Sequence, residues 1–265
     1  MILRVCIGEI KKQKRNYFNT WSTYISLLLW PILTFIGTYF SYKNFDISIL
    51  KKLSIYSYSN LAIFLLTGAL CYNCFWAMVQ GAFFMRNERE NGTLETIFLS
   101  PAPRISIMYG RAIGALLQST WIMFMYSIVI FIIMKDNILH ALLSIITVYL
   151  VVIISAIIWG GFINSIFTVS RDIDFWFIIC DEPMKLFSGV EIPVNIFPII
   201  FQYTSAIFPL FYCLEITRNI FTNNQSSLWL FINYIVSNCV IFIITLFILK
   251  KAEKHNRETG NLQLY

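Results

Sequence analysis

The sequence predicts an all-α integral membrane protein with six transmembrane helices, and its composition and apolar run lengths both indicate this fold class. Hydrophobic residues make up 58% of the 265 residues and charged residues only 13%, whereas a soluble domain has about 25% charged residues. Apolar runs of about 18 residues or more recur, and each can cross a hydrocarbon core of about 30 Å. Residues 1–265 are therefore expected to form one transmembrane domain.

Residues 1–20, before the first apolar run, are predicted to form a helix that lies along the membrane surface. Apolar Val5 and Ile10 alternate with basic Arg4 and Lys11 at roughly helical spacing. Such a helix places its apolar side in the interface and its basic side chains toward anionic headgroups. A solvated tail is the alternative interpretation.

The six predicted spans follow in order along the chain. They occupy residues 21–40, 61–85, 107–134, 139–169, 175–190 and 228–249.

The segment 191–222, between the fifth and sixth spans, is apolar but is not predicted to be a span. Pro193, Pro198 and Pro209 divide it into pieces too short to cross the membrane. We expect a re-entrant segment near the outer surface. A kinked spanning helix is the alternative, but it would make the number of spans odd.

The distribution of Lys and Arg predicts the orientation. Fourteen of the 20 basic residues lie on the side that holds both termini if there are six spans, and basic residues favour the cytoplasmic side. Both termini are therefore expected to be cytoplasmic. Because the basic residues gather beside the ends of apolar runs, their partner is expected to be membrane lipid and not nucleic acid.

A polar interruption at residues 86–106 is predicted to be a cytoplasmic coupling segment between spans 2 and 3. Asn91-Gly92 is a turn signal, and Thr93 can cap a helix that follows it. Leu94 and Ile97 then begin an apolar face at helical spacing, which would fit a groove on a partner protein. A solvated loop is the alternative.

The chain carries no motif for nucleotide or metal chemistry. It lacks the G-x-x-x-x-G-K-[ST] phosphate loop, and His140 and His255 have no metal-ligand partner at useful spacing. We therefore expect a protein that is not an enzyme and has no cofactor of its own. If ATP drives it, another polypeptide binds the nucleotide.

Three charges interrupt the fifth predicted span. An isolated charge in a span costs about 2.5 to 3.5 kcal/mol, so Asp181, Glu182 and Lys185 are not expected to face lipid. They line a polar pathway, or Asp181 and Lys185 form an i,i+4 ion pair, or the span boundary is misplaced. The amide side chains within other spans are further pathway candidates, or bond between helices: Asn73, Gln80 and Asn164.

Glycines in two spans indicate close helix approach. Gly110 and Gly114 open the third span with GxxxG spacing, and Gly160-Gly161 lies in the fourth. Small residues let helix backbones come together in membranes.

The motif Glu-Arg-Glu-Asn-Gly-Thr-Leu-Glu at residues 88–95, followed by Leu99-Ser100-Pro101, resembles a known family. It is similar to the loop between the second and third spans of type-2 ATP-binding-cassette (ABC) permeases of the export class, which includes drug, antibiotic-peptide and polysaccharide exporters. Arg171-Asp172 and the stretch Phe187-Ser188-Gly189-Val190 resemble the same family.

The resemblance implies a membrane subunit that docks on a separate cytoplasmic ATPase, present in two copies per complex, which binds ATP and Mg. A second permease subunit, the same chain or a homologue, completes the pathway. The implied location is a bacterial cell membrane. The motif does not specify the cargo, but the many aromatic residues, among them Trp76, Trp121, Trp159 and Trp176, are compatible with an amphipathic peptide, drug or lipid-linked compound, or they anchor span ends at the interface. The ATPase-coupling residues implied are Glu88, Arg89, Glu90, Gly92, Thr93, Leu94, Glu95, Ile97 and Phe98.

Two other function classes stay open from the residues alone. One is a secondary transporter or channel that needs no ATPase, and the other is a membrane immunity or sensor protein that acts only by binding.

Overall fold

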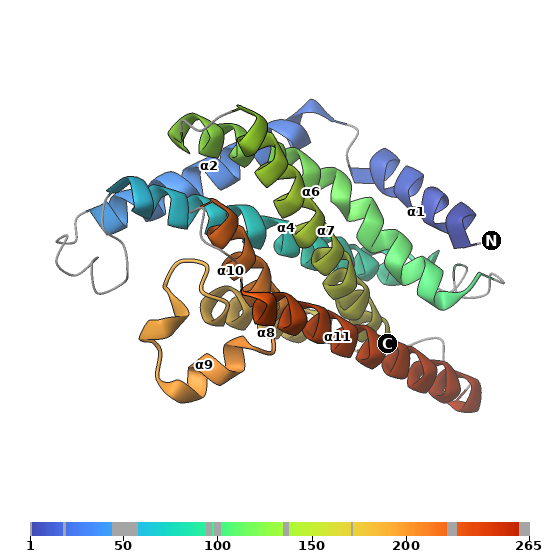
Figure 1. The fold of residues 1–265 in the computed structure, drawn as a ribbon. Coiled ribbons are helices and arrows are strands. Elements are labelled where there is room, and N and C mark those ends of the chain that lie inside the picture. Colours follow the sequence, from blue (N-terminus) through green and yellow to red (C-terminus); the bar gives the residue numbers. More distant parts are fainter. Residues whose placement is uncertain are drawn as a thin grey trace.

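The computed structural model describes residues 2–17, 20–43, 58–93, 97, 102–134, 138–170, 172–221 and 227–259, and among these there is no strand. The all-α membrane fold class is confirmed. The helices are α1 (Ile2–Tyr17), α2 (Trp21–Lys43), α4 (Tyr58–Glu90), α6 (Arg104–Met134), α7 (Ile138–Val169), α8 (Ile173–Phe187), the 3-10 helix η1 (Val194–Ile196), α9 (Ile199–Ser205), α10 (Pro209–Phe221) and α11 (Leu228–Thr259) (Figure 1).

Five described helices are long and apolar enough to cross a membrane, and the count reaches six if a bent pair is one span. The five are α2, α4, α6, α7 and α11, which coincide with five of the six predicted spans. The remaining predicted span, 175–190, is the shorter helix α8. Its 15 residues rise only about 22 Å, less than the hydrocarbon thickness.

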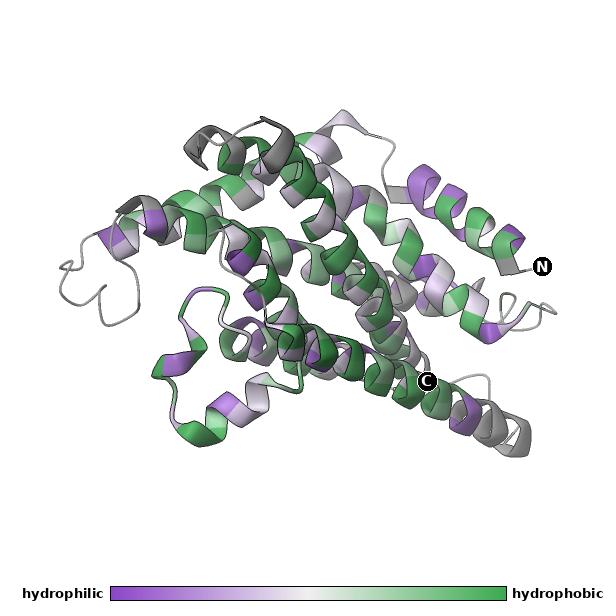
Figure 2. Ribbon diagram, in the orientation of Figure 1, coloured by the Kyte–Doolittle hydropathy of each residue, from purple (hydrophilic) through white to green (hydrophobic). Residues whose placement is uncertain are grey.

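The helix α4 lies at the centre of the bundle. It packs against α2, α6, α7, α8 and α10, and 72% of its apolar window is buried inside the protein, whereas none of the α2 window is. The main hydrophobic core joins Phe75 of α4 to Met123 of α6, Phe167 of α7 and Leu214 of α10. Hydrophobic residues cover most of the long helices (Figure 2).

Glycines allow the close helix contacts that the sequence predicted. A Cβ added at Gly160 of α7 would lie 2.9 Å from the Ala112 Cβ of α6. A Cβ at Gly110 would lie 3.2 Å from the Cys6 Cα, and one at Gly114 would lie 2.7 Å from the Gln13 Cδ. The two α6 glycines therefore receive α1, which packs along α6 in Figure 1.

Prolines begin each short helix between α8 and α11, because proline fixes φ and lacks the N–H that a first turn leaves unpaired. Pro193 precedes η1, Pro198 precedes α9, and Pro209 is the first residue of α10. The axes of α9 and α10 form an angle of 91°. The pair is either a broken span or a re-entrant loop by this geometry, so the re-entrant course stays a prediction.

Candidate functional site

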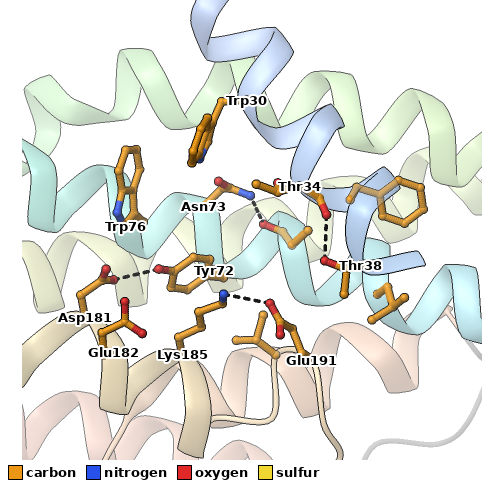
Figure 3. Close-up of a pocket in the computed structure, with 14 residues that line it drawn as sticks. Trp30, Thr34, Thr38, Tyr72, Asn73, Trp76, Asp181, Glu182, Lys185 and Glu191 are labelled. Carbon is orange, nitrogen blue, oxygen red and sulfur yellow. Dashed lines mark hydrogen bonds and ion pairs between the residues drawn. The ribbon is translucent and has the colours of Figure 1, made fainter. Parts of the chain in front are cut away.

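A polar cavity of about 260 Å³ lies among α2, α4 and α8 (Figure 3). Helix α2 contributes Trp30 and Thr34, and α4 contributes Tyr72, Asn73 and Trp76. Tyr72 lies near the middle of the 33-residue α4, so the cavity opens far from either end of that helix. The charged lining residues come from α8 and the turn after it: Asp181, Glu182, Lys185 and Glu191.

Two of the charged residues in this cavity form an ion pair, and a third is held by a hydrogen bond. Lys185 Nζ lies 2.9 Å from Glu191 Oε1 and 5.8 Å from the centre of the Tyr72 ring. Asp181 is only 6% exposed, and it accepts a hydrogen bond from the Tyr72 hydroxyl at 3.0 Å. Lys185 thus has Glu191 as its ion-pair partner, and an Asp181–Lys185 pair, one of the alternatives left open from the sequence, is not among the described ion pairs. The chain turns back after α8 and brings Glu191 to the lysine.

A tight turn fixes the position of Glu191. Gly189 has φ of +84°, a conformation that favours glycine. Arg218 of α10 donates to the Gly189 carbonyl at 2.8 Å and the Val190 carbonyl at 3.3 Å, while its guanidinium stacks 3.7 Å from the centre of the Phe64 ring. Thus α10 holds the turn that closes one side of the cavity.

Four of the six predicted pathway residues line this cavity: Asn73, Asp181, Glu182 and Lys185. The other two lie elsewhere. Gln80 of α4 accepts a hydrogen bond from Gln118 of α6 at 2.8 Å. Asn164 of α7 is fully buried and donates to the Gly160 carbonyl of its own helix at 2.8 Å and to the Met108 carbonyl of α6 at 3.4 Å. Both amides act in helix contacts of the kind that membrane bundles use.

A buried ion cluster joins three helices at the end of α4. Glu88 of α4 pairs with Lys12 of α1 and with Arg111 of α6. Glu9 of α1 adds a second carboxylate, 3.3 Å from Lys12 Nζ and 3.8 Å from Arg111 Nε. Two carboxylates thus meet two cations, and the Arg111 side chain is only 3% exposed. Gln13 extends the cluster by donating to the Arg111 carbonyl at 3.0 Å.

The predicted coupling residues begin directly beside this cluster. Helix α4 ends at Glu90 in the predicted turn, where Gly92 has φ of +68°. The Thr93 hydroxyl donates to the Glu88 carbonyl at 3.1 Å and so closes the end of α4. Glu90, Gly92 and Thr93 are exposed, whereas the carboxylate of Glu88 is occupied by internal cations.

The remaining coupling residues are described only in part. Ile97 is partly buried against the main core. The side chain of Arg89, and Leu94, Glu95 and Phe98, lie outside the described residues. Their docking role stays a prediction.

Sequence reasoning missed most members of both sites. Arg111 is one of the fourteen basic residues used to predict the orientation, although a single arginine within an apolar run usually needs an internal partner. Glu9 and Lys12 lie in the predicted surface helix 1–20, whose basic side chains were expected to face lipid headgroups. Tyr72 and Glu191 carried no signal, because their place in the cavity depends on how α8 packs against α4.

Comparison with protein families identifies the chain. The model of the ABC-2 type transporter family matches residues 3–222, which reach from α1 to the end of α10. The chain belongs to the ABC-2 type transporter family. Comparison with curated proteins gives no match.

As an ABC-2 protein, the chain is a multi-pass membrane permease subunit of an ABC transporter. Such permeases associate with an ABC ATPase and are transport components that are not normally catalytic themselves. The two sites described above are thus two parts of a permease, one among its helices and one at the end of α4.

Proposed function

We propose that this ABC-2 permease works as an exporter for amphipathic cargo. Two permease subunits, either two copies of this chain or this chain and a homologue, form the pathway in a bacterial cell membrane. Two copies of a cytoplasmic ATPase bind ATP and Mg²⁺ and dock on the segment after α4. Both termini lie in the cytoplasm, in line with the distribution of basic residues.

The continuity of α4 is the observation that carries this proposal. One unbroken helix contributes Glu88 to the ion cluster and Tyr72 to the cavity. The two residues are 16 positions apart, or about 24 Å along a helix. A displacement imposed on the end of α4 therefore moves the cavity wall as well.

The ion cluster transmits a displacement of the end of α4 to neighbouring helices as well. Because Glu88 is paired with both α1 and α6, the end of α4 moves together with these helices. The permease responds to nucleotide only through contacts that differ between the two states of the ATPase. The export direction rests on the resemblance of residues 88–95 to the export class.

Co-purification tests the partner first. The permease should retain a soluble protein that contains a phosphate loop, and the complex should hydrolyse ATP. A Thr93→Pro, Leu94→Asp double variant should insert normally but lose this partner or its stimulated hydrolysis, because proline and a charge disrupt a helical docking surface.

A matched control adds the same charge elsewhere. Asn195→Asp places a carboxylate on the exposed η1 segment, and it should leave coupling unchanged. Normal stimulated hydrolysis by the double variant would contradict the coupling assignment. Solute flux through the purified chain without any ATPase would contradict ATP-driven transport.

A further inference from the structure

We propose that the cavity among α2, α4 and α8 selects cargo with a positively charged, organic head group. This inference rests on the proposed function, in which the cavity belongs to the cargo pathway. It adds the chemical class of the group that the cavity recognises.

The charge balance of the lining is the first argument. Asp181, Glu182 and Glu191 supply three carboxylates, and Lys185 is the single basic residue among the described residues that line the cavity. Lys185 is paired with Glu191. Among the described ion pairs, none includes Asp181 or Glu182. Within the described residues, the exposed Glu182 and the buried Asp181 therefore form no ion pair, and only Asp181 is shielded from solvent.

The environment of Asp181 makes this imbalance informative. A carboxylate that is 94% buried is costly unless a cation compensates it, and Asp181 has only the Tyr72 hydroxyl as a hydrogen-bond donor among the described residues. That donor favours the ionised form and fixes one oxygen. A bound cation is the partner that this geometry lacks.

The aromatic walls specify what kind of cation fits. Trp30 and Trp76 line the cavity together with Tyr72 (Figure 3). Aromatic faces attract ammonium and guanidinium groups, and Lys185 already places its ammonium 5.8 Å from the Tyr72 ring centre.

A metal ion fits the cavity less well. No group of three or more His, Cys, Asp or Glu suited to holding a metal occurs among the described residues. An organic cation with an apolar body uses both the carboxylates and the rings.

A pair of aromatic ions of opposite charge tests this inference. The permease in nanodiscs is titrated calorimetrically with phenyltrimethylammonium and with benzenesulfonate, and the heats of empty nanodiscs are subtracted. Phenyltrimethylammonium should bind and benzenesulfonate should not. Equal binding of the two ions, or binding of the anion alone, would overturn the inference.

Three variants make the test specific. Asp181→Asn should weaken binding of phenyltrimethylammonium about tenfold. Lys185→Gln should tighten binding several-fold, because it removes the one ammonium and releases Glu191, and misfolding cannot produce such a gain. Asp174→Asn removes the same charge from α8 outside the cavity, and should change nothing. Affinity that ignores both Asp181→Asn and Lys185→Gln would overturn the inference.

Failure of this inference can be distinguished from failure of the proposed function. If the ATPase co-purifies and is coupled but the cation does not bind, the cargo class is wrong and the exporter stands. If the cation binds selectively but no ATPase associates, the cation site stands and the exporter proposal fails.

Discussion

The ion cluster at the end of α4 and the cavity near its middle differ in how their charges are paired. In the cluster, Glu9 and Glu88 face Lys12 and Arg111, so the charges balance. In the cavity, Lys185 pairs with Glu191, and none of the described ion pairs includes Asp181 or Glu182. The balanced charges join α1, α4 and α6, whereas the cavity carboxylates are the groups that the proposal above assigns to a bound cation.

Removing one cation from the balanced cluster is expected to have the largest effect on stability. Arg111→Met leaves Glu88 with Lys12 as its remaining cation and should lower the free energy of unfolding by about 3 to 5 kcal/mol, the usual cost of breaking a buried pair. The measurement is thermal unfolding of the purified permease in detergent. Lys14→Met removes an exposed cation from α1 and should change stability by less than about 0.5 kcal/mol. Similar losses of stability in the two variants would show that the ion cluster does not stabilise the packing of α1, α4 and α6.

Separating α1 from α6 should have the next largest effect. Gly114→Leu places a side chain against Gln13 and should cost about 1 to 3 kcal/mol through overpacking. Thermal unfolding measures the loss, and maleimide labelling of Cys6, whose thiol contacts the Ser106 carbonyl at 3.7 Å, reports displacement of α1. Gly37→Leu in α2 meets no atom within 4 Å and should be tolerated. Unchanged Cys6 labelling would contradict the close packing of α1.

Removing the carboxylate charge of Asp181 should raise the stability of the permease, whereas the two preceding substitutions lower it. Asp181→Asn keeps an acceptor for the Tyr72 hydroxyl and removes a buried carboxylate charge, so the permease should become about 1 kcal/mol more stable. Ligand sites are often kept at some expense of stability. The same thermal unfolding experiment measures the change. A clear loss of stability would mean that Asp181 is a structural residue.

The pair within the cavity should have the smallest effect on stability. The side chains of Lys185 and Glu191 are 37% and 40% exposed, and exposed pairs contribute about 0 to 1 kcal/mol. Lys185→Gln should therefore shift thermal unfolding only slightly, although it changes cation binding. A shift as large as that of Arg111→Met would remove the distinction between the two regions.

The long helices could be predicted because span length and apolar composition are local properties of the sequence. Residues 21–40 and 107–134, for example, lie within α2 and α6. The same reasoning overestimated the fifth span: Gly189 adopts a positive φ and the helix ends at Phe187. Helical spacing also left an Asp181–Lys185 pair open as an alternative, and nothing in the sequence shows that the turn after α8 brings Glu191 to Lys185.

The candidate sites could be predicted only in part. Four of the cavity residues were recognisable because polar groups in apolar runs are costly and need a reason. The ion cluster was not, because its members are far apart in the chain. Gln13 and the Arg111 carbonyl, for instance, are separated by 98 positions.

The sequence by itself determined that the chain is an all-α membrane permease, because hydrophobicity, run length and the motif at 88–95 need no knowledge of neighbours. Only the tertiary structure decided which charges are balanced. Pairing depends on distances of a few ångströms between side chains of different helices, and these distances arise from packing: glycines at 110 and 114 admit α1 to the cluster, and Arg218 holds the turn that gives Lys185 its partner.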